Sequence, residues 1–234
     1  MSDRSVSVIL PVRNGERYIA EALASLFGQT RPPTEVIVVD DGSTDRSAEI
    51  AGGFPVQLIR IDATGVSAAR NAGLAAADGD LIAFIDHDDI WEPLKLERQI
   101  RFLDEHPGVG FATCWLRVVV EAGTDRPSWV EDEYMTAGLP GMCPGVLLVR
   151  REVIDRVGGF DTNLALGEDA DWVLRAADAG VRRAAVDEVL LRYRIHGANT
   201  TVRKPVTAPV VFNVLRMALA RRHGAVAGGD TRAR

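Results

Sequence analysis

The sequence predicts an α/β protein with a central, mostly parallel β-sheet flanked by helices. Over the first 110 residues, short β-branched runs alternate with amphipathic stretches, the pattern that builds a parallel sheet through helical crossovers. Two of these buried runs also end abruptly in acidic turns. The carboxyl ends of parallel strands form the edge where α/β proteins bind their ligands.

In the first half of the chain we expect strands at 6–12, 35–39, 56–61 and 81–85. Helices are expected at about 19–27 and 66–77, in a short segment ending at residue 51, and from about 93 to 105. Asn14 is placed to cap the first helix, Ser43 or Thr44 the second, and Pro93 suits the start of the last.

In the second half, we expect a strand at 109–120 and then a polar, Gly- and Pro-rich loop at 121–144 that is functional or mobile. A short strand at 146–149, a helix at 151–157, a turn at 158–161, a helix at 168–179 and a strand at 186–195 follow. A basic helix over 208–223 leads into a Gly-rich end that we expect to be disordered.

Composition excludes several classes of protein. The 234 residues are 47% hydrophobic and 26% charged, which is typical of a globular domain. No signal-peptide pattern or apolar run of ~20 residues is present, so we expect a cytoplasmic protein. The net charge of −6 argues against nucleic-acid binding. Cys114 and Cys143 are isolated, which predicts buried thiols rather than a disulfide or a zinc site.

The two acidic turns are Asp40-Asp41 and the segment from Asp86 to Asp89. Asp86 and Asp88 are two residues apart, so in extended backbone both side chains point to one side. Clustered carboxylates at the edge of a core are costly unless a cation compensates their charge. A site with only a few carboxylate oxygens is typical of Mg²⁺ or Mn²⁺, which keeps some water ligands and also binds phosphate groups. The pattern predicts a diphosphate ligand with a bridging metal. Asp-rich turns also occur simply as turn formers or helix caps, and that reading stays open here.

Six segments then resemble, in order, the family 2 glycosyltransferases of the inverting GT-A type, which are nucleotide-diphospho-sugar transferases: VSVILPVRN, EVIVVDDGSTD, GVSAARNAGLAAADGDLIAFIDHDDIW, GGFD, GEDADWVLR and YRIHGANTT. The resemblance covers residues 5–202 approximately. It implies one GT-A domain over 1–204, with a nucleotide-binding half at about 1–110 and an acceptor-binding half at about 111–204, before a basic segment at 205–234.

The resemblance also implies residue roles. The donor nucleotide would be bound by Pro11, Val12, Asn14, Asp41, Arg70, Asp86 and Asp88. Asp41 would contact the base, and Asp88 would ligate Mn²⁺ or Mg²⁺ with His196 beside it. Asp169 would be the catalytic base, and Glu168, Trp172 and Phe160 are acceptor-site candidates.

The pKa of Asp169 depends on opposing effects that the sequence leaves open. Burial or the neighbouring acids Glu168 and Asp171 would raise it toward neutrality, whereas a position at a helix start would lower it.

The resemblance implies a metal-dependent, inverting and non-processive transfer from a nucleotide-diphosphate sugar, with UDP expected, to a hydroxyl of a saccharide, lipid-linked glycan or small molecule. Two alternatives are a catalytically silent sugar-nucleotide-binding protein and a nucleotidyltransferase. The segment Pro11 to Gly15 is a poor substitute for the phosphate loop that a nucleotidyltransferase needs.

The basic C-terminal segment has two interpretations. From Arg192 onward, nine Lys or Arg residues face a single acid, Asp230. The favoured interpretation packs Phe212, Leu215 and Leu219 on the domain and leaves Arg216, Arg221 and Arg222 solvated. The alternative is contact with anionic lipid at the inner membrane face, which would suit a lipid-linked acceptor.

Overall fold

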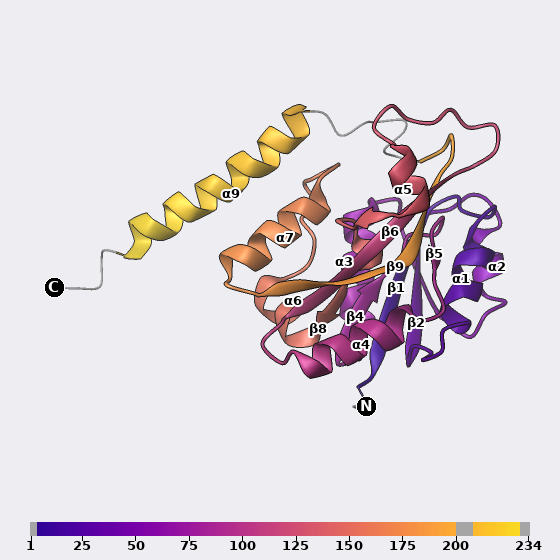
Figure 1. Ribbon diagram of the computed structural model, residues 1–234, viewed down its shortest axis with the longest axis horizontal. Coiled ribbons are helices and arrows are strands. Elements are labelled where there is room, and N and C mark those ends of the chain that lie inside the picture. The colour runs from indigo at the N-terminus through magenta and orange to yellow at the C-terminus, as the bar shows by residue number, and fades with distance from the viewer. Residues whose placement is uncertain (1–3, 200–207, 230–234) are drawn as a thin grey trace.

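The computed structural model describes residues 4–199 and 208–229. A single mixed sheet lies at its centre, in the order β3-β2-β1-β4-β8-β6-β9-β5, with β7 paired to β6 (Figure 1). The strands are β1 (Val6–Val12), β2 (Glu35–Asp41), β3 (Gln57–Ile61), β4 (Leu81–Phe84), β5 (Ile90–Trp91), β6 (Phe111–Val120), β7 (Leu139–Pro140), β8 (Leu148–Arg150) and β9 (Arg183–Ile195). The helices are α1 (Ile19–Phe27), α2 (Ser47–Ala51), α3 (Val66–Ala76), α4 (Lys95–Glu105), α5 (Asp132–Thr136), α6 (Arg151–Val157), α7 (Glu168–Asp178) and α9 (Ala208–Gly229).

The direction of winding reverses between β1 and β4. The chain moves outward from β1 to β2 and β3, and α3 then returns it across β1 to β4, all four strands being parallel. Such a switch point leaves a crevice at the carboxyl ends of the two strands. The segments that meet there are the end of β1 at Val12 and the acidic segment that begins at Asp86.

The second half of the sheet departs from the expected parallel arrangement. β8 runs antiparallel to both β4 and β6, whereas β9 runs parallel to β6. β9 thereby brings its carboxyl end, followed directly by His196, back toward the crevice. The expected mostly parallel sheet is therefore found in the first half, and the second half is mixed.

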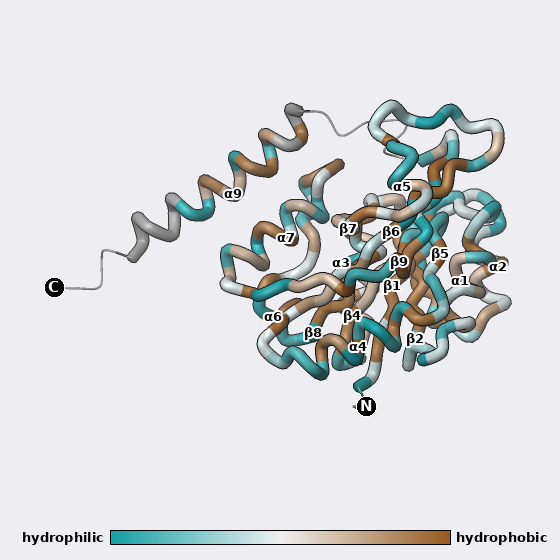
Figure 2. The backbone as a smooth tube through the Cα atoms, viewed as in Figure 1, coloured by the Kyte–Doolittle hydropathy of each residue, from teal (hydrophilic) through white to brown (hydrophobic). Residues whose placement is uncertain are grey.

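The core is built around β1, whose seven residues are all buried. Figure 2 shows hydrophobic residues concentrated in the central strands and hydrophilic residues more frequent in the surrounding segments, as along α4. α3 lies very close to this strand, because a Cβ atom added to Gly73 would stand only 2.4 Å from Cγ2 of Ile9. This close packing fixes the height of α3, and with it Arg70, above the sheet.

Several local expectations were wrong. The segment 121–144 contains α5 and β7 rather than forming one long loop. Asn14 does not cap α1: its side-chain oxygen accepts a hydrogen bond from the Thr44 amide at 2.8 Å, and its own amide donates to the Ser43 hydroxyl at 2.9 Å. Because these three side chains link the loop after β1 to the loop after β2, they brace one side of the crevice instead of starting helices.

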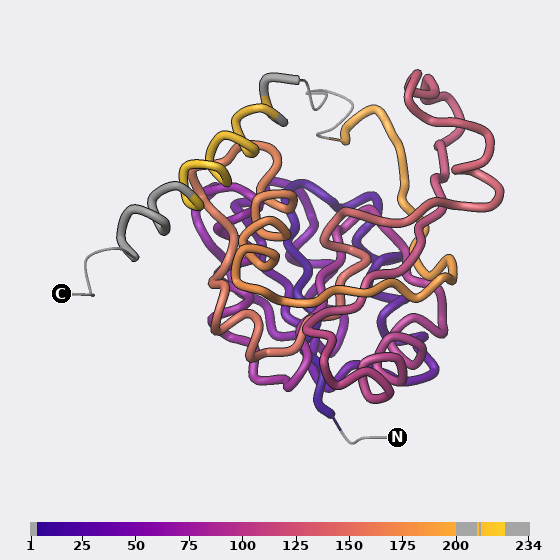
Figure 3. Tube along the Cα trace, turned by 60° about the vertical axis from the view of Figure 1, so that its left-hand side comes forward, coloured from indigo at the N-terminus to yellow at the C-terminus, as the bar shows by residue number. Residues whose placement is uncertain are grey.

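The C-terminal helix also differs from the prediction. α9 continues to Gly229, through the Gly-rich end, and lies beside α7 (Figure 3). Among the side chains of α9 that the structure describes, Val214 and Ala218 are buried, whereas Phe212, Leu215 and Leu219 are exposed. The favoured packing is therefore wrong in its choice of face. None of the described helices is long and apolar enough to span a bilayer, and residues 200–207 and 230–234 lie outside the described part of the chain.

Candidate active site

Asp88 follows β4, and residues just past β9 hold its carboxylate. Oδ2 of Asp88 lies 3.0 Å from Nε2 of His196 and accepts a 3.0 Å hydrogen bond from Nδ2 of Asn199. Burial acts to raise the pKa of Asp88, but the hydrogen bond to His196 and the nearby imidazoles outweigh it and lower the pKa. The structure thus brings the two expected metal-site residues together, with Asp88 as an anion.

His196 is held by residues that the sequence analysis did not single out. Its backbone amide donates to Oδ1 of Asn199 at 2.5 Å, and its ring lies 4.4 Å from the ring of Tyr18. Tyr18 in turn donates to Glu121 at 2.9 Å. The three-residue spacing between His196 and Asn199 could have predicted that both side chains lie on one turn. The segment Asn199-Thr200-Thr201 also matches the pattern of a glycosylation site, and that match drew attention away from a structural role for Asn199.

Arg70 connects the donor-side acids to the start of α7. Its side chain is 3% exposed, and its two terminal nitrogens donate to Oδ1 of Asp86 and to Oε1 of Glu168, both at 2.8 Å. The guanidinium also lies 5.3 Å from the centre of the Phe160 ring. Glu168 is therefore a partner of Arg70, and this buried bridge joins β4 to α7 across the crevice.

Asp169 lies beside that bridge, in the first turn of α7. Its Oδ1 accepts the Ala170 amide at 2.7 Å. Burial, followed by the charge of Glu168, raises the pKa of Asp169, and these effects exceed the lowering by the Ala170 amide and Arg70. The opposing effects left open by the sequence are thus resolved toward a higher pKa, as a general base requires.

The residues expected to bind the nucleotide base lie near the carboxyl ends of β1 and β2. Both oxygens of the buried Asp41 carboxylate accept hydrogen bonds from backbone amides, one from Thr64 at 2.6 Å and one from Gly65 at 2.9 Å. Asp41 therefore shapes the turn that leads into α3. Pro11 and Val12 are buried in β1, whereas Asn14 is exposed.

Phe160 and Trp172 lie in the core rather than on an open acceptor surface. They are only 4% and 1% exposed, and Nε1 of Trp172 donates to the Gly158 carbonyl at 2.9 Å. Phe160 packs edge-on against Phe84, with ring centres 5.3 Å apart. The expectation that Trp172 lines the acceptor site is thus corrected to support from beneath it, because so little of its ring is accessible.

The model of the glycosyl transferase family 2 domain matches residues 7–158 of this sequence. The chain belongs to glycosyltransferase family 2. Curated relatives include uncharacterized glycosyltransferases of Nostoc sp., 32% identical over 212 residues, and of Haemophilus influenzae, 31% identical over 182 residues. These alignments cover 83% and 73% of this chain, but only 66% and 61% of the relatives.

Solved structures confirm the GT-A fold of this family 2 glycosyltransferase. Staphylococcus aureus TarS 1–349 in complex with UDP-GlcNAc superimposes with a TM-score of 0.74, at 24% identity over 92% of this chain and 65% of TarS. Glucosyl-3-phosphoglycerate synthase of Mycobacterium tuberculosis, in complex with Mn²⁺, UDP and glucosyl-3-phosphoglycerate, gives 0.66 at 21% identity over 92% and 80% of the two chains.

In this family 2 glycosyltransferase, Asp88 and His196 are the two neighbouring side chains that could hold a metal ion. Within residues 4–199 and 208–229, no cluster of three or more His, Cys, Asp or Glu side chains is arranged to hold a metal. One carboxylate oxygen and one imidazole nitrogen nevertheless fit a Mn²⁺ or Mg²⁺ ion that takes its other ligands from water and a diphosphate. The donor set thus suits a cation that binds together with the nucleotide.

Asp89 of this glycosyltransferase has a structural environment instead. It is 1% exposed, and its Oδ1 accepts the Arg194 amide at 3.1 Å. Burial, with the charges of Asp88 and Asp86, raises its pKa well above the ordinary value. Because the side chain is buried and accepts the Arg194 amide, Asp89 links the segment after β4 to β9, and no side chain caps α4.

Proposed function

We propose that this family 2 glycosyltransferase moves one sugar at a time from a UDP-sugar to an acceptor hydroxyl, with inversion and with the help of Mn²⁺ or Mg²⁺. The observation that carries the proposal is the buried Arg70 bridge. It holds Asp86 of the donor side against Glu168, beside a carboxyl, Asp169, whose pKa is raised. The UDP, UDP-GlcNAc and Mn²⁺ in the two similar structures support this class of donor and cation.

The chemistry follows from this placement. The Asp169 carboxylate accepts the proton of the acceptor hydroxyl, whose oxygen forms a bond to the anomeric carbon. The bond from that carbon to the diphosphate oxygen breaks, and its electron pair leaves with the nucleoside diphosphate from the opposite face, which inverts the configuration. Asp88 and His196 would hold the cation, which when bound neutralises charge on the diphosphate.

The alternatives are less well supported. Family membership favours a sugar transferase over a nucleotidyltransferase. A silent sugar-nucleotide-binding protein would not need a carboxyl with a raised pKa beside the donor site, and Asp169 is such a group.

Isothermal titration with UDP, GDP, TDP and CDP, each with and without Mn²⁺, tests the donor proposal. We expect UDP to bind in a metal-dependent manner and Asp88→Ala to weaken binding at least about tenfold, because the variant loses a direct ligand. The exposed Asp125→Ala, in the segment after β6, is the control and should bind UDP normally. If no nucleotide binds to the wild-type protein, the proposal is wrong.

We also propose that the outer face of α9, formed by Phe212, Leu215 and Leu219, contacts anionic lipid. These side chains are 69%, 45% and 53% exposed. The sequence from 208 to 229 contains no Asp or Glu, and the exposed Arg216 lies beside them. An apolar surface flanked by positive charge complements a bilayer with negative headgroups.

A further inference from the structure

Asp171 is a buried carboxylate that takes no part in the proposed transfer. One arginine from each of two helices, α7 and α9, forms an ion pair with it. Asp171 is 1% exposed and lies two residues after Asp169 in the first turn of α7. Nε of Arg175, one turn later, donates to Oδ2 at 2.8 Å, and Nη1 of Arg221 on α9 donates to Oδ1 at 2.8 Å. The C-terminal helix thus supplies one of the two cations that this buried charge requires.

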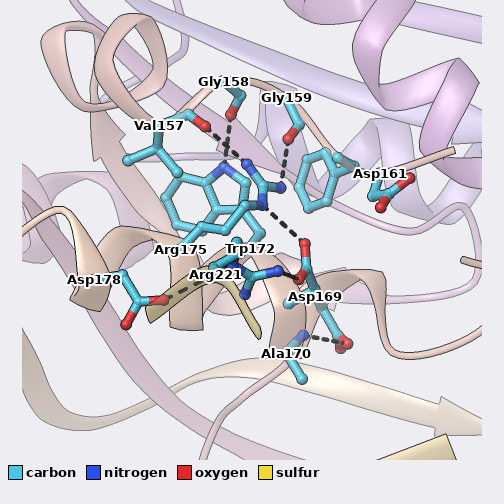
Figure 4. A network of polar contacts seen from close by, with 12 residues as sticks. Val157, Gly158, Gly159, Asp161, Asp169, Ala170, Trp172, Arg175, Asp178 and Arg221 are labelled. Carbon is cyan, nitrogen blue, oxygen red and sulfur yellow. Dashed lines mark hydrogen bonds and ion pairs between the residues drawn. The ribbon is translucent and has the colours of Figure 1, made fainter. Parts of the chain in front are cut away.

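Arg175 extends the same network to the turn that precedes Phe160. Its two terminal nitrogens donate to the carbonyls of Val157 at 2.8 Å and Gly159 at 2.6 Å, on either side of the Gly158 carbonyl that Trp172 binds (Figure 4). Asp171 therefore connects α9, α7 and this turn through a single side chain.

A second contact places α9 directly over the start of α7. Gly167, the residue before Glu168, has φ +84°. A Cβ atom at Gly167 would lie 3.0 Å from Cγ2 of Val214 and 3.4 Å from Cγ1 of Val210. The left-handed backbone and the close approach of α9 both favour glycine at the point where the catalytic helix begins.

The contacts also give α9 a direction. Val214 touches the start of α7, whereas Arg222 bonds Asp178 at its end, at 2.6 Å. The two helices therefore run side by side in the same direction. Arg221 bonds Asp171 near the start of α7, and its Nε lies 3.8 Å from Oδ2 of Asp178 at the end of that helix, where Arg222 also binds.

We propose that α9 positions the general base, with Arg221 as the positioning residue that acts through Asp171 on the first turn of α7. The inference rests on the proposed function in that Asp169 is the base. Removing Arg221 leaves the buried Asp171 charge short of one partner, so the first turn of α7 shifts or opens to hydrate it. Asp169 then leaves its place beside the Arg70 bridge, while the UDP side of the crevice is unchanged.

Arg221→Ala and Arg222→Ala form a matched pair, because both remove an arginine from Asp178, whereas Arg221→Ala also removes one from Asp171. We expect amide hydrogen exchange in residues 168–172 to become about tenfold faster or more in Arg221→Ala and to stay unchanged in Arg222→Ala. UDP release from UDP-GlcNAc, with water as the acceptor, should show a lower kcat and an unchanged KM in Arg221→Ala only. Arg221→Lys should restore part of both effects, since it keeps a cation.

Three results would overturn the proposal: equal exchange in both alanine variants, unchanged exchange in Arg221→Ala, or loss of UDP affinity in Arg221→Ala alone. Should Arg221→Ala unfold, Arg221→Gln replaces it, because the shorter, neutral amide removes the charge while it keeps a polar side chain and most of the aliphatic stem. Hydrogen exchange requires no substrate, so failure of the positioning role is distinguished from failure of the donor proposal, which appears as no UDP binding in the wild-type protein.

Discussion

Two aspartates on one turn of α7 occupy opposite electrostatic environments. Asp171 accepts hydrogen bonds from two arginines, whereas Asp169 has the carboxylate Glu168 beside it. Burial and the charge of Glu168 raise the pKa of Asp169 by more than the charge of Arg70 lowers it. Separated environments for neighbouring carboxyl groups are a common means of giving one of them a proton-transfer role.

The pH dependence of activity should report Asp169. Its pKa is raised, so we expect the acid limb of the kcat/KM profile to fall at a pH above the ordinary pKa of 3.8, as the base becomes protonated. Asp169→Asn should lose about 10²-fold or more in UDP release, because the amide cannot accept the proton. A stopped assay of UDP release across pH provides both measurements.

The ionised form of Asp169, which the proposed reaction needs, lowers the stability of the folded protein. A carboxyl whose folded-state pKa is raised favours folding when protonated, and this contribution is lost as pH rises through the folded-state pKa. Asp169→Asn should therefore be more stable than wild type to urea at pH 7, with a smaller difference near pH 4. Asp45→Asn is the control with reversed sign, since hydrogen bonds from Ser47 and backbone amides overcome burial and lower the pKa of Asp45. Equal stability of Asp169→Asn and wild type at pH 7 would contradict the raised pKa.

Single residues also mark the limit of sequence reasoning. Asp86, Asp88 and Asp169 could be singled out as candidates because their motifs are local in the chain. Asn199 acts through Asp88, 111 positions earlier, and no local pattern encodes that contact. For the same reason Glu168, which bonds Arg70 from α7, was expected at the acceptor site.

Among the elements, α3 depends most on close packing. Gly73 faces β1 at a distance that excludes any side chain, and Arg70 is one turn earlier on the same helix. Gly73→Ala should lower the free energy of unfolding by about 1–3 kcal/mol through overpacking, and it should weaken UDP binding by displacing Arg70. Urea denaturation and titration measure these effects.

Gly52→Ala is a suitable control for that change. Gly52 ends α2 with φ −64°, and an added Cβ would meet nothing closer than 3.4 Å. We expect no loss of stability, or a small gain from reduced freedom of the unfolded chain. If Gly73→Ala is as stable as Gly52→Ala, the close approach of α3 to β1 has no energetic importance.

Most helices and strands were predictable because their periodicity is local. The strands β1, β2 and β4 are built on short apolar runs, as central parallel strands require. The short strands β5 and β7 were not predicted, since two residues carry no period and their pairing depends on distant partners. The packed face of α9 was misassigned because apolar residues occur on both faces, so periodicity could not choose between them.

Across the whole molecule, an acidic body is joined to a basic C-terminal helix. Binding to vesicles with negative headgroups should therefore exceed binding to neutral vesicles and weaken as salt increases. Replacing Phe212 and Leu219 by Ser should reduce binding by at least about tenfold, because each apolar side chain contributes about 1.5–3 kcal/mol when buried. Co-sedimentation is the measurement.

Trp129→Ser is the matched control, since Trp129 is 48% exposed on the segment between β6 and α5. It should bind vesicles like the wild-type protein. Equal binding by all variants would reject the lipid contact. A dimer in light scattering that dissociates in the Phe212 and Leu219 variant would instead assign the outer face of α9 to a second copy.

The contact between Arg221 and Asp171 spans 50 positions of the chain, and this separation has a consequence for synthesis. The ribosome synthesises α7 first, then β9, and α9 last. The long pairing of β9 with β6 can thus form before α9 exists. The sheet and the donor crevice can therefore form while Asp171 still lacks its second arginine. Under the positioning role proposed for α9, a nascent chain would gain the ability to hold nucleotide first and the ability to transfer sugar last, which separates the two activities in time.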